Sequence, residues 1–358
     1  MFCFTPPVTD TLPSMEIHAS RLTALVEQLF TAAGCQATEA ETIARRLVQA
    51  NLVGHDSHGV IRAPIYIQWL QQGMVLANQA PQVVLDSGAL GLLDGQLGFG
   101  QVMGEHAMNM AIDKARQSGV AVVGLRNSGH VGRVGDWPEM AAAAGLISFC
   151  LVNTTGLGML TAPFGGIDRR LSANPFAAGI PTAEGAPIIL DISCSAVAEG
   201  KLKVALNKGI AVPEGCIIDH DGQPTTDPTV FYGDPPGAIL SFGGHKGYGL
   251  GLVVELLAGA LTGGGCTQPG KDRLEQGMLS IVIDPHRFQP ADTFSTEVDQ
   301  FIQWVKGSRT QTPEGEILTP GEPERRTRAQ RTQDGIPLDE KTWQQLLASF
   351  AEWDVRVD

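Results

Sequence analysis

The sequence predicts an α/β protein. From residue 82 onward, short apolar segments typical of strands alternate with longer amphipathic segments typical of helices. Before that point, apolar residues recur every three or four positions between residues 17 and 48, which is the periodicity of amphipathic helices. Hydrophobic residues make up 43% of the 358 residues and charged residues 18%, so the chain can bury a large core and does not have the composition of a disordered protein.

The N-terminal part is predicted to be helical. We expect two helices within residues 16–52, interrupted at Gly34, and a third helix over residues 61–72 that ends at Gly73. Residues 1–14 hold three prolines and no basic segment ahead of an apolar run. We therefore interpret them as a flexible arm rather than a secretory signal.

The remainder of the chain is predicted to alternate between strands and helices. Runs of β-branched and aliphatic residues favour strands, and apolar residues at helical spacing favour helices. The arginine-rich helix near the C-terminus is expected to be solvated. We expect strands at residues 82–86, 91–94, 120–125, 147–152, 188–192 and 280–283, and helices at residues 104–118, 138–144, 247–262, 296–307, 322–333 and 340–353.

Charge and cysteine content exclude several classes of partner. The formal net charge of −13 repels nucleic acids and anionic membranes, so we expect neither as a partner. No apolar run reaches the length of about 20 residues that a membrane-spanning helix needs. The six cysteines are scattered without a CxxC pair, which favours reduced thiols in the cytoplasm over a zinc ribbon or a disulfide framework. Neither HxxxH nor HExxH occurs, so we expect no metal site.

The densest group of ionisable side chains lies in the sequence GHDSHGVIR at residues 54–62, followed by Tyr66. A histidine titrates near neutral pH and can move a proton, and an arginine can bind a carboxylate through two parallel hydrogen bonds. Arg62 and Tyr66 are four residues apart on the predicted helix and would share a face. We assign Ser57 and His58 to proton transfer, Arg62 and Tyr66 to binding of an anionic substrate, and His55 and Asp56 to support.

Four further segments place polar or glycine-rich loops directly after predicted strands or at a helix start. Such loops let backbone N–H groups approach a ligand, and open α/β sheets bind ligands at the carboxyl ends of their strands. None of the four matches the GxGxxG dinucleotide fingerprint. The histidines could instead be structural, and Asp191 could be a helix N-cap. The segments are GHVGRVG at 129–135, NTTG at 153–156, DISCS at 191–195 and GGHKGYG at 243–249.

Several motifs together resemble one family. In chain order they are HDSHGVIRAPIY, GHVGRVG, APFGG, SANPFAAGIP, LDISCSAVAEGK and GHKGYGLGLVVELLAGAL. This order resembles the malate/L-lactate dehydrogenase-like oxidoreductases of the type 2, sulfolactate-dehydrogenase kind, and most closely their bacterial hydroxycarboxylate dehydrogenase branch. The resemblance extends over about residues 16–353. This chain has SANP where many members have GTNP, and Cys194 lies within the loop that follows Asp191.

The resemblance implies a non-Rossmann nicotinamide-binding fold, NAD or NADP as the cofactor, and a homodimer with the active site near the subunit interface. By matching motif, Ser57 and His58 fall on the proton-relay pair and Arg62 on the carboxylate clamp. His130 falls on a histidine that serves some members as the acid or base. Expected cofactor contacts are His130, Val131, Gly132, Arg133, Val134, Thr155, Asp191, Ile192, Ser193, Ser195, His245, Lys246, Gly321, Glu322 and Pro323.

The implied organisation follows from these assignments. The arm at residues 1–14 precedes a helical segment at 15–80, a cofactor-binding α/β region at 81–270, and a C-terminal region at 271–358 that packs back on the helical part. The implied reaction moves a hydride between nicotinamide C4 and C2 of a 2-oxo or 2-hydroxy acid. Two alternatives remain open: reduction of a cyclic imine acid such as piperideine-2-carboxylate, and a catalytically silent binding protein on the same scaffold.

Overall fold

The chain forms two compact units. The computed structural model describes residues 15–183 and 186–357, so the expected arm at residues 1–14 lies outside the described residues. The first unit, here called the helical unit, comprises the described residues 15–69 and 324–357. The second, here called the sheet unit, comprises residues 70–323. The units therefore divide the chain at residues 69/70 and 323/324, whereas the sequence suggested boundaries near 80 and 270.

The helical unit is built on two amphipathic helices. Helices α1 (Ala19–Ala32) and α2 (Ala37–Leu52) pack on each other, and their apolar stripes are buried, as shown by Leu29 and Leu47 at 0% exposure. These helices confirm the periodicity seen in the sequence. The C-terminal helix α10 (Glu340–Glu352) packs on α1, and its N-cap Asp339 accepts a hydrogen bond from the amide of Thr342.

A short strand at the start of the helical unit was not predicted. Residues 16 and 17 were expected to be helical, but β1 (Met15–Ile17) is a strand that pairs antiparallel with β12 (Ile336–Leu338). Ile17 lies opposite Ile336, and both are buried. The partner strand lies more than 300 residues away along the chain, so local periodicity carries no signal for it.

The loop after α2 contains two 3-10 turns, Asp56–His58 and Val60–Arg62. Helix α3 (Ala63–Gln71) begins directly after them, so Arg62 stands in a turn before the helix rather than on it as predicted. Helix α9 (Glu322–Asp334) lies where the sequence predicted a helix. Its first two residues belong to the sheet unit and the rest to the helical unit.

Within the described residues, the sheet unit contains a seven-stranded mixed sheet. Only β3 and β4 pair in parallel, and the other neighbours are antiparallel. β11 comes late in the chain but lies between β4 and β5, in the middle of the sheet. In spatial order the strands are β2 (Gln82–Ser87), β3 (Leu90–Asp94), β4 (Val120–Ser128), β11 (Gln276–Ile283), β5 (Ile147–Thr154), β6 (Phe176–Ile180) and β7 (Ile188–Ile192).

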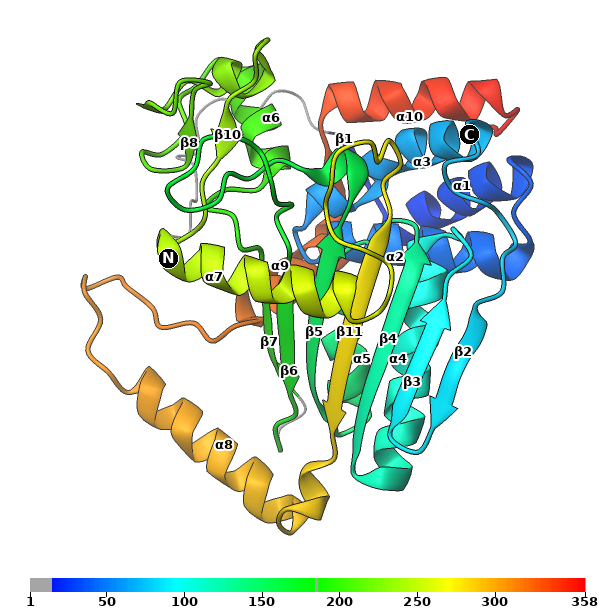
Figure 1. Cartoon of the computed structure of the whole chain (residues 1–358). Helices are drawn as coiled ribbons and strands as arrows, with labels where there is room; N and C mark the ends of the chain where they lie inside the picture. Colours follow the sequence, from blue (N-terminus) through cyan, green and yellow to red (C-terminus); the bar gives the residue numbers. More distant parts are fainter. Residues whose placement is uncertain (1–14, 184–185, 358) are drawn as a thin grey trace. The chain divides into compact units, whose positions relative to one another are not determined.

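Helices cover both faces of this sheet (Figure 1). Side chains on one strand alternate between faces. Cys150 and Val152 on β5 therefore join a core with α4 (Gly100–Ser118) and α5 (Asp136–Ala143), while Leu151 joins another core beneath α7 (His245–Val254). This double covering explains why the central strands read as continuous apolar runs in the sequence.

The helix predicted at residues 247–262 changes character midway. α7 is followed by a π-helix over Glu255–Ala260. This segment lies very close to the sheet, because a Cβ on Gly277 would lie 2.2 Å from the carbonyl oxygen of Ala258. The buried carboxylate of Glu255 accepts hydrogen bonds from the side-chain amides of Asn153 and Asn174, at 3.2 and 2.7 Å. π turns of this kind are frequent at functional sites.

The remaining elements lie outside the seven-stranded sheet. They include three short strands that form a separate small sheet and two helices. The sequence predicted α8 and a helix carrying Lys201, which is α6, but not the small sheet. These elements are β8 (Ile217–Ile218), β9 (Pro224–Thr225), β10 (Ala238–Ile239), α6 (Glu199–Lys208) and α8 (Ala291–Lys306). Among the described residues, no helix has the length and hydropathy required to cross a membrane.

A truncation in the central sheet tests the core. Leu125 on β4 is fully buried between the sheet and α4, so Leu125→Ala is expected to lower the free energy of unfolding by about 3 kcal/mol, through lost burial and the cavity left behind. Urea denaturation followed by circular dichroism measures the change. Leu90→Ala on β3 is the matched control, because Leu90 is 49% exposed and should cost no more than about 0.5 kcal/mol. Equal effects of the two substitutions would contradict the placement of the core.

Candidate active site

The proton and carboxylate groups lie together in the loop between α2 and α3 of the helical unit. Ser57 Oγ and His58 Nδ1 are 3.1 Å apart, which is hydrogen-bonding distance. Which of the two donates depends on the imidazole tautomer. The contact orients the ring of His58, while the role of the two residues in proton transfer stays a prediction.

Arg62 is oriented by the backbone of the same loop. Its Nε donates a 2.6 Å hydrogen bond to the carbonyl oxygen of Ser57. This bond uses Nε and does not involve the edge formed by the two Nη groups. An edge of this kind binds a carboxylate through two parallel hydrogen bonds. The arrangement therefore suits a proton donor and a carboxylate clamp separated by one turn of chain.

Tyr66 lies one turn beyond Arg62 on α3. It is 2% exposed, and its ring stacks on Trp69 with the centroids 5.5 Å apart. Packing thus holds the ring in one place. Its expected contact with substrate remains a prediction.

The residues just before Ser57 contact helix α9, a contact that was not predicted from the sequence. His55 and Asp56 were interpreted as support, and they contact Glu324 and Arg331 of α9. The sequence suggested that α9 is solvated, because its arginines follow no apolar stripe. The partners of Glu324 and Arg331 lie 269 and 275 residues earlier in the chain, and no local pattern indicates such contacts.

In the sheet unit, two of the predicted loops are joined by one buried side chain. Gln276, at the first position of β11, accepts a 2.7 Å hydrogen bond from the amide of Val131 and donates a 2.7 Å bond to Thr154 Oγ1. It therefore ties the GHVGRVG loop to the NTTG loop at the carboxyl ends of β4 and β5. Gln276 was not predicted from the sequence, because its burial and its place at the start of β11 are known only from the structure.

Arg133 is turned into the protein. Its side chain is 1% exposed, and Nη1 contacts Asp136 and Glu139 at 2.9 and 2.8 Å, while Nε lies 3.8 Å from Asp191. Burial alone would lower the pKa of Arg133, but the three carboxylates outweigh burial, and the net pKa is raised. Arg133 is therefore charged and held within the protein, so its side chain is not presented to a ligand.

Asp191 lies at the end of β7 and accepts a 2.8 Å hydrogen bond from the amide of Gly135. Gly135 is the N-cap residue of α5, so the carboxylate stabilises the start of that helix. The alternative that Asp191 is a helix N-cap is thus replaced by a related one: it contacts a distant helix, not the one that follows it. A Cβ on Gly135 would lie 2.9 Å from Asp191 Oδ2, so glycine permits the approach.

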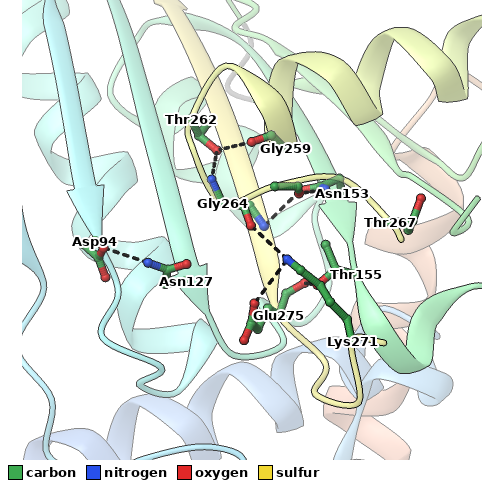
Figure 2. Close-up of polar contacts among 12 residues, drawn as sticks. Asp94, Asn127, Asn153, Thr155, Gly259, Thr262, Gly264, Thr267, Lys271 and Glu275 are labelled. Atoms are coloured by element: carbon green, nitrogen blue, oxygen red, sulfur yellow. Dashed lines mark hydrogen bonds and ion pairs between the residues drawn. The ribbon is translucent and has the colours of Figure 1, made fainter. Parts of the chain in front are cut away.

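Thr155 is fixed by the loop that leads into β11. Its amide donates to the carbonyl of Glu275 at 2.9 Å. Figure 2 shows Lys271 of the same loop between the carbonyl of Gly264 and the carboxylate of Glu275, at 3.3 and 3.7 Å. Loop 262–275 therefore closes over the NTTG segment on the side of the π-helix.

Two further predicted segments border the N-terminus of α7. Ser193 and Ser195 share a 2.9 Å hydroxyl contact, and Cys194 between them is buried. His245, the first residue of α7, meets Phe164 edge-to-face with ring centroids 6.0 Å apart. Lys246 is exposed. Residues 193–195, here called the SCS loop, are linked to the start of α7 by a hydrogen bond from the amide of Phe242 to the carbonyl of Cys194.

The segment at residues 321–323 ends the sheet unit and starts α9. Gly321 has a φ of +88°, a backbone conformation that favours glycine. Glu322 accepts from Lys306 Nζ at 2.6 Å and from the amide of Thr319 at 3.2 Å. The Glu322 carboxylate is thus held by neighbours within its own unit.

The predicted residues therefore fall into two groups, each connected within its own unit. Ser57, His58, Arg62 and Tyr66 belong to the helical unit, and the expected cofactor residues belong to the sheet unit. Across the described ranges, no cluster of three or more His, Cys, Asp or Glu side chains has the geometry to hold a metal ion.

Comparison with known proteins supports the resemblance. Residues 17–347 match the protein-family model described as malate/L-lactate dehydrogenase. Hydroxycarboxylate dehydrogenase B of Escherichia coli O157:H7 is 42% identical over 333 residues, covering 92% of this chain and 91% of that protein. The solved structure of sulfolactate dehydrogenase from Methanocaldococcus jannaschii has a TM-score of 0.85 at 35% identity, covering 96% of this chain and 98% of that one.

A reductase of a cyclic imine acid is also a structural neighbour. The structure of Δ1-piperideine-2-carboxylate reductase from Pseudomonas syringae pv. tomato has a TM-score of 0.83 at 30% identity, covering 94% of this chain and 99% of that one. Together these matches confirm the α/β fold and the family resemblance that the sequence motifs indicate.

Cys194 tests the burial of the SCS loop. Burial raises the pKa of the Cys194 thiol to about 12, so at pH 8 its reactive thiolate is scarce. Iodoacetamide is expected to label Cys194 at least about 1,000-fold more slowly in the folded protein than after unfolding, and labelling should accelerate as pH rises. Peptide mass spectrometry gives the rates, with the partly exposed Cys266 as the internal control. Equal labelling of folded and unfolded protein would contradict a buried loop.

Proposed function

The chain belongs to the malate/L-lactate dehydrogenase family, and we propose that it is an NAD(P)-dependent dehydrogenase of 2-hydroxy acids. The hydride would move between nicotinamide C4 and C2 of a 2-hydroxy or 2-oxo acid. The observation that carries the proposal is the loop in which Ser57 contacts His58 while Arg62 is anchored to the Ser57 carbonyl. It supplies a proton-transfer group and a carboxylate-binding group in fixed relation.

In this proposal His58 handles the proton. During reduction, negative charge develops on the C2 oxygen, and a protonated imidazole donates to it; during oxidation the neutral imidazole accepts the proton. Ser57 holds the ring through its contact with Nδ1, which directs Nε2 toward the substrate. His130 is proposed to polarise the same oxygen or to line the nicotinamide.

Arg62 binds the C1 carboxylate of the substrate. Its Nε is already bonded to the Ser57 carbonyl, so the guanidinium plane is set before substrate arrives. A bidentate pair fixes both position and rotation of the carboxylate, which orients C2 for transfer. Tyr66 is proposed to border the substrate one turn along α3.

The sheet unit fits a dinucleotide at the start of α7. Gly243 and Gly244 form the turn before the helix, with φ values of +55° and +61°. Because both residues are glycines, the turn has no side chains of its own that would cover the N-terminus of the helix. A helix N-terminus attracts phosphate, and the exposed Lys246 adds a positive charge. His245 and Lys246 would therefore hold the diphosphate. When bound, the nicotinamide supplies the hydride.

The other expected contacts fit as backbone or hydroxyl groups. The GHVGRVG loop can offer its amides, with Gly132 at a φ of +78°, and Thr155 and the SCS loop can offer hydroxyls. Arg133 is proposed to act by holding Asp191 and the loop in place rather than by contacting phosphate, because its guanidinium is buried among carboxylates.

The functional form is proposed to be a cytoplasmic homodimer. Each copy carries exposed aromatic side chains at α8, with Phe301 and Trp304 61% and 76% exposed and stacked on each other. A second apolar row, with Leu256 and Leu261 at 51% and 63%, runs along the π-helix. A second copy would cover both rows reciprocally. The five described cysteines are all free, which favours a reducing compartment.

Reduction of a cyclic imine acid is the second candidate. It is favoured by the match to the piperideine-2-carboxylate reductase. The same loop would serve, with the proton going to nitrogen in place of oxygen.

A substrate panel tests the function. Purified protein is assayed with NADH and NADPH against 2-oxo acids and against piperideine- and pyrroline-2-carboxylate. Turnover of 2-oxo acids is expected to exceed that of the imines. Preference for the imines would select the second candidate, and absence of binding to either cofactor in a thermal-shift assay would return the silent binding protein.

The two histidines can be separated by kinetics. His58→Ala is expected to lower kcat by about 100- to 10,000-fold, because the general acid is lost. His130→Ala is expected to have the smaller effect on kcat. Steady-state rates with the best substrate measure both. Retention of kcat in His58→Ala together with a loss of several orders of magnitude in His130→Ala would reverse the assignment.

Arg62 can be tested through KM. Arg62→Ala should raise KM for carboxylate substrates by about 10- to 100-fold, the value of a charge-assisted hydrogen-bonded pair. Arg62→Lys is the graded control and should recover only part of the loss, since an ammonium cannot bind both oxygens in one plane. An unchanged KM in Arg62→Ala would remove this residue from the clamp role.

A further inference from the structure

We propose that Asn51, Asp56 and Arg331 form a positioning clamp for the reactive loop at residues 57–62. The proposal rests on the proposed function of Ser57, His58 and Arg62, and it adds three residues that do not themselves contact substrate. All three lie within the helical unit. Their side chains are referred to below as the clamp.

Arg331 holds Asp56 in a bidentate pair. Its Nη1 and Nη2 donate to the two carboxylate oxygens of Asp56 at 2.6 and 3.0 Å. Nη1 also donates to the backbone carbonyl of Asn51, at the end of α2. One guanidinium thus connects the end of the helix to the first residue of the first 3-10 turn, and the planar fork fixes their relative orientation.

Asn51 connects the same carboxylate to the second 3-10 turn. Its side chain is buried, at 1% exposure of the residue, and Nδ2 donates to Asp56 Oδ1 at 2.6 Å. Its Oδ1 accepts a 2.8 Å bond from the amide of Val60. The side-chain amide of Asn51 therefore bonds to residues 56 and 60, which lie on either side of Ser57 and His58 in the sequence.

Gly59 is required by this arrangement. A Cβ at position 59 would lie 2.2 Å from Asn51 Oδ1 and 2.6 Å from Nδ2. Any side chain there would displace the buried amide. The second glycine of the GHDSHG motif is thus explained by the space that Asn51 occupies and not by a left-handed backbone, since its φ is −87°.

The clamp reaches Arg62 through one peptide group. Asp56 is adjacent to Ser57, and the Ser57 carbonyl is the acceptor that orients the Arg62 guanidinium. Loosening Asp56 would shift both the hydroxyl that holds His58 and the carbonyl that holds Arg62. Loss of the clamp should therefore weaken proton transfer and carboxylate binding together.

One face of α9 is devoted to this loop. Glu324 contacts His55 at 3.3 Å, and Thr327 Cγ2 lies 3.2 Å from the position of a Cβ on Gly54. With Arg331, these residues recur at helical spacing of three and four positions. The polar sequence of α9 is thus not merely a solvated surface.

The clamp should matter more for activity than for stability. The side chains of Arg331 and Asp56 are 16% and 50% exposed, and an ion pair exposed to this degree contributes little to folding. We expect Arg331→Ala to lower Tm by no more than roughly 4 °C, while a small displacement of the reacting groups can reduce kcat/KM by about 100-fold. That separation distinguishes positioning from support of the fold.

The experiment combines kinetics with chemical rescue. The full-length protein is compared with Arg331→Ala, Arg331→Lys, and the control Gln333→Ala on the exposed part of α9. We expect loss of kcat and rise of KM in Arg331→Ala, partial recovery on addition of guanidinium at non-denaturing concentration, and little recovery in Arg331→Lys, whose ammonium lacks the fork. Gln333→Ala should match wild type. Wild-type kinetics in Arg331→Ala, or a loss that guanidinium does not relieve, would overturn the proposal.

Hydrogen exchange tests the clamp without any substrate. The amide of Val60 is bonded to Asn51, so it should be protected in wild type and exchange at least about 10-fold faster in Asn51→Ser and Arg331→Ala. Unchanged exchange of the peptide covering residues 56–62 would overturn the clamp even if the enzyme is active. If wild type shows no dehydrogenase activity but exchange responds as expected, the clamp stands and the proposed function fails.

Discussion

The insertion of β11 between β4 and β5 is the constraint on which the arrangement of the loops at one edge of the sheet depends. β11 runs antiparallel to both neighbours, so its first residue meets the last residues of each. Gln276 occupies that position, and its buried amide bonds to Val131 on one side and Thr154 on the other. The GHVGRVG and NTTG loops, which are separate in sequence, are thereby hydrogen-bonded to the same side chain.

The π-helix packs closely on the face of the sheet that lies opposite α4 and α5. Its close approach to the sheet requires glycine at 259 and 277, where a Cβ would meet Asn153 Nδ2 or the Ala258 carbonyl. Glu255 is buried against Asn153 and Asn174, has no cationic partner among the described residues, and accepts hydrogen bonds from amide donors. Strand ends, the SANP segment and the loop shown in Figure 2 are therefore parts of one hydrogen-bonded assembly.

Four cations of this acidic chain have two kinds of surroundings. Arg133 and Arg331 are committed to carboxylates of the protein, where they hold loops. Arg62 donates to a backbone carbonyl, and Lys246 is exposed at a helix N-terminus. These two are the cations that we propose to bind the anionic ligands. In a protein with a net charge of −13, such local positive groups decide where an anion can bind.

The sequence by itself determined the fold class and the helices and strands with strong periodicity, and it pointed to the side chains that we propose for proton transfer and carboxylate binding. These are local properties, because residues within a few positions of one another set them. Only the tertiary structure decided the pairing of β1 with β12, the central place of β11, the π turn after Val254, and the partners of Arg133 and Asp56. The strand pairings and the contact of Asp56 with Arg331 join residues more than a hundred positions apart, and Asp191 of β7 reaches Arg133 from a separate part of the chain. Packing that no local pattern encodes fixes the space between such residues.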